Sequence, residues 1–205
     1  MKTAGVDEAG RGPVIGPMCV AAVMMQEDEL FKLKELGVKD SKLISPKKRR
    51  ELSIEIGKIA ETAILEVTAY QIDEMRKEMT MNDLAVVSFS EVLLRLRPDK
   101  AIVDAVDVKP HRFSENLKKR YDLPIEIISE HKADVNHPIV SAASVIAKVR
   151  RDQRIKELED SLGFSIGSGY PSDPKTIIFI EEIVKKEHQL PDYVRHSWKT
   201  IDRFK

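Results

Sequence analysis

The sequence GVDEAGRGPVIGPM, residues Gly5 to Met18, places two adjacent carboxylates and a glycine-rich connection between two apolar segments. A short apolar run ends on Asp7 and Glu8, and a second run begins at Gly16, which predicts two strands joined by a turn. Glycines in such a turn let the backbone approach a ligand closely and direct its N–H groups at phosphate or hydroxyl oxygens. The stretch therefore predicts a ligand site at the end of the first strand.

A dinucleotide-binding turn is the obvious alternative for a glycine-rich connection after a strand. The glycine spacing of a dinucleotide-binding turn differs from the spacing in this stretch, and such a turn leads into an amphipathic helix. An apolar strand containing Pro13 and Pro17 follows instead. We therefore reject this alternative.

The rest of the chain alternates predicted strands and helices. Strands are expected at 3–7, 16–25, 62–69, 101–104 and 125–129, and helices at 46–59, 82–96, from 110, from 138 and at 175–186. The first three strands are expected to form an antiparallel meander, and the later strand–helix alternation predicts parallel pairing. We expect an α/β fold in which helices flank a mixed sheet, with a core at 1–145 and a helical C-terminal part packed on it at 146–205.

Four acidic residues lie at predicted strand ends or before a helix: Asp7, Glu8, Asp104 and Asp134. Carboxylates that gather at one edge of a sheet repel one another, and their burial without a cation is costly. Mg²⁺ prefers oxygen ligands, and two ions roughly 3.5–4 Å apart can stabilise both the attacking and the leaving oxygen of a phosphodiester displacement. Taken singly, each acid is explained better as a cap or as a solvated strand end.

The composition describes a soluble globular protein. The 205 residues include 34 basic and 34 acidic side chains, with 42% hydrophobic and 33% charged residues, which excludes a disordered or fibrous chain. The single cysteine, Cys19, excludes a disulfide framework. The longest uncharged run, 12–26, is too short to span a bilayer, and acidic residues stand where a signal peptide would be apolar. We expect a cytoplasmic monomer that does not bind membranes.

These residues together resemble the signature of the type 2 ribonucleases H, the ribonuclease HII family. The likeness continues through Asp40-Ser41-Lys42, Asp104, His131–Asp134, Ser141–Ser144 with Lys148, and Gly167–Pro174, in the order of the family. The resemblance implies a ribonuclease H-like fold and an endonuclease with two Mg²⁺ or Mn²⁺ ions. Its substrates would be the RNA strand of RNA–DNA hybrids and ribonucleotides embedded in duplex DNA, cut to leave 3′-hydroxyl and 5′-phosphate ends.

The same resemblance assigns roles to single residues. It makes Asp7, Glu8, Asp104 and Asp134 the catalytic metal ligands. Gly10-Arg11-Gly12 is similar to the loop that probes the ribose 2′-hydroxyl, the group that distinguishes RNA from DNA. Tyr170 matches a tyrosine that stacks on the sugar at the RNA–DNA junction. Lys42 matches a contact to backbone phosphate, in line with eight basic against two acidic residues at 31–50. His131 is interpreted as structural.

Two other classes of function compete with this interpretation. Gly163 to Gly167 fits the G-x-S-x-G pattern of serine hydrolases around Ser165, and Asp173 and His188 follow in triad order. A charged helix is expected before Ser165, however, where a hydrolase needs a strand. A non-catalytic nucleic-acid-binding module would be favoured if the basic residues were the only signal. EDTA separates the three, because only a metal-dependent nuclease loses its activity.

The C-terminal residues carry one further pattern. Ile201 and Phe204 are three positions apart, so one helical turn puts both on the same side. This arrangement resembles the short peptides that dock on the replication sliding clamp, with Trp198 where glutamine is usual. The alternative is that both residues seal the last helix onto the protein, and the sequence does not decide between the two.

Overall fold

The computed structural model describes residues 1–38, 44–120 and 124–204. Lys42, for which a phosphate contact is predicted, lies outside these ranges. Five strands form one mixed sheet in the order β3-β2-β1-β4-β5. Their bounds are β1 Lys2–Ala9, β2 Met18–Gln26, β3 Glu61–Val67, β4 Lys100–Asp104 and β5 Glu126–Glu130. β1 to β3 pair antiparallel and β1, β4 and β5 pair parallel, which confirms the predicted meander and crossover connections.

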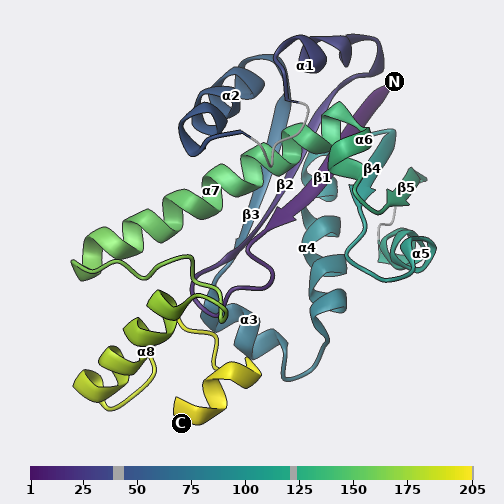
Figure 1. The fold of residues 1–205 in the computed structure, drawn as a ribbon. Coiled ribbons are helices and arrows are strands. Elements are labelled where there is room, and N and C mark those ends of the chain that lie inside the picture. The colour runs from purple at the N-terminus through teal and green to yellow at the C-terminus, as the bar shows by residue number, and fades with distance from the viewer. Residues whose placement is uncertain (39–43, 121–123, 205) are drawn as a thin grey trace.

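Helices cover both faces of the sheet (Figure 1). Their bounds are α1 Phe31–Glu35, α2 Pro46–Ile59, α3 Ala69–Met75, α4 Met81–Leu96, α5 Pro110–Arg120, α6 Ala133–Asn136, α7 Pro138–Leu162 and α8 Pro174–Glu187, with 3₁₀ turns at Glu27–Glu29 and Lys199–Phe204. One hydrophobic cluster joins α4 and α5 to one face, and a second joins α1, α2 and α7 to the other. Successive residues of β2, such as Val20 and Ala21, point to opposite faces of the sheet and belong to the two different clusters.

Some boundaries differ from those predicted, for local reasons. The third strand ends at Val67 instead of residue 69, because Thr68 caps the short helix α3 in a capping box with Gln71. The second strand begins at Met18 instead of residue 16. The short helices α1, α3 and α6 are absent from the prediction, since seven residues or fewer show too little periodicity to be recognised.

Helix α7 lies directly across the central strands (Figure 1). A Cβ atom added to Gly5 would lie 2.4 Å from the backbone of Ile139, so only glycine permits this close approach of β1 and α7. Residues 139–147 of the helix are buried, and most of its second half is at least partly exposed. The helix therefore places its first turns beside the carboxylates at the end of β1.

A third hydrophobic cluster joins the C-terminal part of the chain to the connection between β1 and β2. Val14 and Ile15 from that connection pack with residues of α7, α8 and the last 3₁₀ turn. Val14 N also donates to Gly169 O at 2.7 Å. α7 runs without a break across residues 145 and 146, where the predicted core is expected to meet the helical C-terminal part. The division of the chain into these two parts stays a prediction. None of the helices in the described ranges is both long and apolar enough to cross a membrane.

Candidate active site

The parallel strands β1 and β4 bring the predicted carboxylates to one edge of the sheet. Val6 pairs with Val103, so Asp7 and Asp104 are the next residues on neighbouring strands. Ala133 N donates to Oδ1 of Asp104 at 2.8 Å, which fixes the start of α6 beside the end of β4. Asp134, the second residue of that short helix, is 5% exposed. Three separate elements thus supply the four acids.

Burial changes the acidity of the first two carboxylates. It is the main cause that raises the pKa of Asp7 from 3.8 to about 7, and the charge of Asp104 raises it further. Burial and then the charge of Asp7 raise the pKa of Glu8 well above its usual value, although Arg11 opposes this shift. The charges of Asp7, Glu8 and Asp104 are therefore close enough to repel one another, as the sequence predicts.

Helix α7 supplies a polar contact to this group. The Ser144 side chain forms a hydrogen bond with Asp7, which lowers the pKa of that carboxyl and partly offsets its burial. Lys148 Nζ donates to the Ser144 hydroxyl at 2.6 Å, one helical turn further along. The family resemblance includes both residues, but the sequence alone assigns neither of them a role. Their spacing of four on a helix is the signal that could have linked them.

The side chains present suit a divalent cation. Every donor in the set is a carboxylate oxygen, the type that Mg²⁺ and Mn²⁺ prefer. Glu8 Oε2 is buried and accepts no hydrogen bond from the described residues, so it is an oxygen for which a cation would be a suitable partner. Within the described ranges, however, no three His, Cys, Asp or Glu side chains already surround a common point. Metal binding by the four acids therefore stays a prediction.

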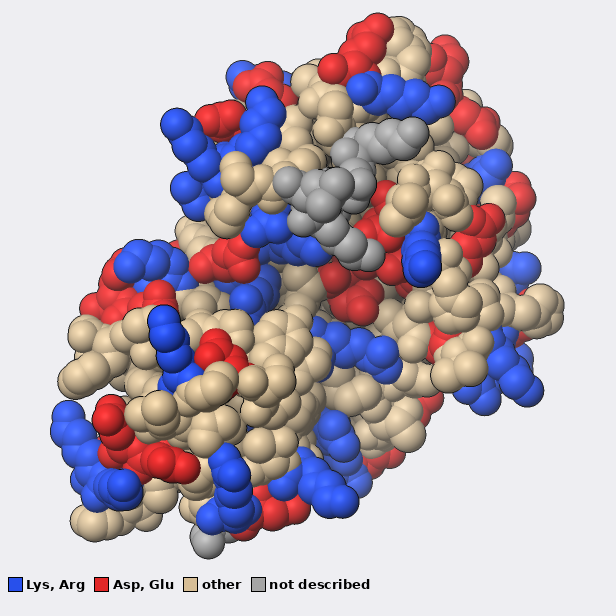
Figure 2. Space-filling view, in the orientation of Figure 1, with Lys and Arg blue, Asp and Glu red and all other residues tan. Residues whose placement is uncertain are grey.

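A pocket of about 320 Å³ adjoins the carboxylates. Its lining combines two acids, several cations and an aromatic ring, namely Glu8, Asp152, Arg11, Arg49, Lys148, Arg151 and Tyr170. Asp152 forms ion pairs with Arg49 and Arg151 at 3.4 and 3.5 Å. Figure 2 shows acidic side chains within a hollow on this face of the molecule, bordered by lysine and arginine. Cations around an acidic centre are suited to bind the phosphates of a nucleic acid on either side of the bond that reacts. Arg49 and Arg151 are not among the substrate-binding residues predicted from the sequence.

The predicted loop Gly10-Arg11-Gly12 and Tyr170 lie next to each other in the wall of this pocket. Gly10 has a φ of +82°, and a Cβ atom there would lie 2.6 Å from Pro17 O, so the turn requires glycine. A Cβ atom at Gly12 would lie 3.4 Å from Cε1 of Tyr170, which places the ring against the loop. Tyr170 remains 42% exposed, so its ring is open to a ligand.

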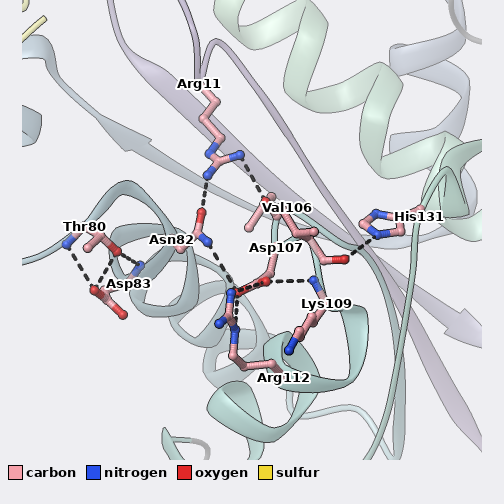
Figure 3. A network of polar contacts seen from close by, with 10 residues as sticks. Arg11, Thr80, Asn82, Asp83, Val106, Asp107, Lys109, Arg112 and His131 are labelled. Atoms are coloured by element: carbon pink, nitrogen blue, oxygen red, sulfur yellow. Dashed lines mark hydrogen bonds and ion pairs between the residues drawn. The ribbon is translucent and has the colours of Figure 1, made fainter.

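The Arg11 side chain is held in a polar network (Figure 3). Its guanidinium donates to Val106 O at 3.2 Å and to the side-chain oxygen of Asn82. Asn82 in turn donates to Asp107, which Arg112 binds with two nitrogens. The side chain of Arg11 thus ties the loop to the start of α4 and to the segment after β4.

The alternative site around Ser165 does not form. Ser165 lies just after the end of α7 and donates to Glu159 at 3.0 Å. Asp173 caps α8 by accepting from Lys175 N, and His188 lies at the other end of the same helix. His131 donates to Val108 O at 3.2 Å, in keeping with a structural role. Ile201, one of the two predicted clamp-binding residues, is fully buried in the third cluster, and Phe204 is partly buried beside it.

The order of the strands, with carboxylates at the ends of β1 and β4, defines the ribonuclease H-like class of nucleases. The chain matches the family model described as ribonuclease HII over residues 4–201. A ribonuclease HII from Methanothrix thermoacetophila is 50% identical over 202 residues, which cover 98% of this chain and 96% of that protein.

Solved structures agree with this assignment. The ribonuclease H2 of Pyrococcus horikoshii has a TM-score of 0.94 and 42% identity over 100% of this chain and 97% of that one. The ribonuclease HII of Archaeoglobus fulgidus, solved in a complex with PCNA, has a TM-score of 0.90 and 42% identity over 97% and 96%. The chain belongs to the ribonuclease HII family and is thus a type 2 ribonuclease H, an endoribonuclease.

Proposed function

We propose that this endoribonuclease hydrolyses the RNA strand of RNA–DNA hybrids and cuts at single ribonucleotides in duplex DNA. The cluster of Asp7, Glu8 and Asp104 beside α6 carries this proposal, because it joins oxygen ligands to a pocket lined with cations. Asp134 completes the set of four acids that would hold two Mg²⁺ or Mn²⁺ ions. When bound, the ions supply an activated water and charge stabilisation for the departing 3′-oxygen.

The residues of the chain have separate tasks in this proposal. Asp7 must lose its proton before it can bind a cation, and burial raises the pKa of the metal-free carboxyl to about 7, so cation binding and proton release are coupled. Lys148 and Arg151 bind the phosphates that flank the reacting bond. The Gly10–Gly12 loop contacts the 2′-hydroxyl, and the Tyr170 ring stacks on the sugar that follows. Only a ribonucleotide presents the hydroxyl that completes this set of contacts.

The test is cleavage of a DNA duplex that contains one ribonucleotide, with Mg²⁺, Mn²⁺ or EDTA. We expect cleavage with either metal, none with EDTA, and a 3′ end that a DNA polymerase extends. Asp134→Asn should lose cleavage and keep its affinity for the duplex, because phosphate contacts dominate affinity. Asp160→Asn, at an exposed site on distal α7, is the matched control. Cleavage in EDTA, or product ends that cannot be extended, would refute the proposal.

We also propose the sliding clamp as a partner, supported by the similarity to the Archaeoglobus fulgidus protein solved with PCNA. Ile201 is 0% exposed and belongs to the hydrophobic core, so it seals the C-terminal turn. Phe204 is only partly buried and lies one turn further along. Phe204 is therefore the apolar side chain of this pair that is available to a clamp. Binding of the full-length protein to PCNA, measured by titration, tests this partner.

A further inference from the structure

Three consecutive carbonyl groups of the glycine loop are held by one segment near the end of the chain. The carbonyl oxygens of Gly10 and Arg11 accept from the Arg195 guanidinium at 2.5 and 2.9 Å. The carbonyl oxygen of Gly12 accepts from Trp198 Nε1 at 3.0 Å. These contacts join residues that are 184 to 186 positions apart in the sequence.

Arg195 is a buried cation whose bonds go to this connection. It is 0% exposed and heads the fully buried side chains by volume. Its guanidinium makes four hydrogen bonds to the carbonyl oxygens of Gly10, Arg11 and Gly16. A guanidinium has five N–H donors in a rigid plane, so four are used here. A buried charge without such partners would be strongly destabilising, which makes these bonds obligatory for the folded state.

The direction of the carbonyls fixes the direction of the N–H groups that follow them. In a trans peptide the C=O and N–H of one unit point in opposite directions. The N–H groups of Arg11 and Gly12 share peptide units with the Gly10 and Arg11 carbonyls and therefore point away from Arg195. Neither N–H donates to any acceptor in the described part of the chain, although both residues line the pocket beside Glu8. The Gly12 carbonyl shares its peptide unit with Pro13, which has no N–H, so the Trp198 contact fixes the end of the loop.

The segment that makes these contacts is itself held firmly by α3. The backbone N–H groups of His196 and Ser197 donate to the two carboxylate oxygens of Asp73, at 2.6 and 2.9 Å. The guanidinium carbons of Arg76 and Arg195 lie 5.0 and 4.8 Å from the centre of the Trp198 ring. A fixed support of this kind restricts the loop to one conformation.

We propose that Arg195 and Trp198 are positioning residues for the glycine loop. Arg195 holds the Gly10 and Arg11 carbonyls so that the Arg11 and Gly12 N–H groups face the ribose 2′-oxygen, and Trp198 anchors the Gly12 end of the loop. This inference rests on the proposed contact of the loop with the 2′-hydroxyl. Neither side chain touches the substrate. Both act through the direction of the loop backbone, and the preference for a ribonucleotide over a deoxyribonucleotide depends on them.

Two variants test the proposal. Arg195→Lys keeps a cation but replaces the planar donor group with a single ammonium, which cannot reach three carbonyls in the same geometry. Trp198→Phe keeps the ring and removes only the donor to Gly12. Arg95→Lys is the matched control, because Arg95 also donates to a carbonyl, Ile64 O at 3.0 Å, but lies away from the loop.

Two measurements separate positioning from a general structural role. The first is the kcat of the active protein on a duplex with one ribonucleotide, which we expect to fall about 10- to 100-fold in Arg195→Lys. We expect a fall of about 3- to 10-fold in Trp198→Phe. The second is the ratio of affinities for that duplex and for an all-DNA duplex, measured with Mg²⁺ in an Asp134→Asn background. This ratio should decrease, while affinity for the all-DNA duplex stays within about twofold.

The outcomes distinguish this inference from the proposed function. Folded variants with an unchanged ratio and unchanged kcat overturn the positioning role, and so does an equal loss of affinity for both duplexes. If Arg195→Lys does not fold, Trp198→Phe decides alone. If the Asp134→Asn protein with an intact loop shows no preference for the ribonucleotide, the proposed 2′-hydroxyl contact fails instead.

Discussion

Replacement of Asp7 by asparagine should abolish cleavage and at the same time stabilise the metal-free protein at pH 8. Asp7 is buried, and burial with the nearby charge of Asp104 raises its pKa from 3.8 to about 7. Its Oδ1 atom accepts from Glu8 N at 2.7 Å. Asparagine keeps an oxygen for this bond and carries no charge at any pH. The substitution therefore removes the unfavourable charge and preserves the backbone contact.

The size of the effect follows from the pKa shift. At a pH below 3.8 the folded and unfolded chains both hold the proton, and Asp7 adds no pH dependence. Between pH 4 and pH 7 only the folded chain holds it, so the free energy of unfolding falls as the pH rises. Above pH 7 the full penalty applies, on the order of 4 kcal/mol for a shift of this size. This value is an upper bound, because water penetration and relaxation reduce the cost of burying a charge.

Urea unfolding of both proteins at pH 5 and pH 8, in EDTA, measures this difference. The stability gained by Asp7→Asn should be larger at pH 8 than at pH 5, and at least about 1 kcal/mol at pH 8. Mg²⁺ at pH 8 should stabilise the wild type more than the variant, because a ligand stabilises the state that binds it. Asp160→Asn should show no such pH dependence. A variant that is no more stable than the wild type at pH 8 would refute the reasoning.

Four further substitutions address the substrate and the partner. Tyr170→Ala should lower cleavage at a single ribonucleotide more than cleavage of an all-RNA strand, because stacking on a following deoxyribose exists only at a junction; equal losses would indicate a packing role. Lys42→Ala should weaken duplex binding and reduce its salt dependence by about one counterion, which a titration at several salt concentrations detects. Phe204→Ala should weaken binding to PCNA and leave thermal stability nearly unchanged. Ile201→Ala should instead cost about 2–5 kcal/mol of stability, and the reverse pattern would exchange the two roles.

The sequence predicts the carboxylate edge well because the signals are local. Asp7 and Asp104 each follow a short apolar strand, and parallel strands end at the same edge of a sheet. Asp134 is harder to predict, since α6 has only four residues and begins after Lys132 with a φ of +58°. A left-handed lysine has no recognisable pattern in the sequence. The sequence shows Asp134 only as an acid before a predicted helix, and its assignment as a metal ligand rests on the family resemblance.

The support of the glycine loop was not predictable from local sequence. Arg195 stands in a polar stretch where an arginine is expected to be exposed. Its carbonyl partners lie 179 to 185 positions earlier in the chain, so no periodicity connects them. The spacing of Ile201 and Phe204 likewise could not distinguish a sealed turn from a docking peptide. That distinction depends on the third cluster, to which Val14 and Ile15 contribute from the opposite end of the chain.

The central place of β1 in the sheet has a consequence for the uniformity of the site. From Thr3 to Val6 this strand is paired with β2 on one side and with β4 on the other. Amide hydrogens in such a strand exchange with solvent only when the whole domain unfolds, whereas loops open locally at a lower free energy. We therefore expect the β1 backbone that leads into Asp7 to open only at a high free energy. A destabilising substitution elsewhere in the sheet should therefore change the number of folded molecules, while the position of Asp7 in each folded molecule should stay the same.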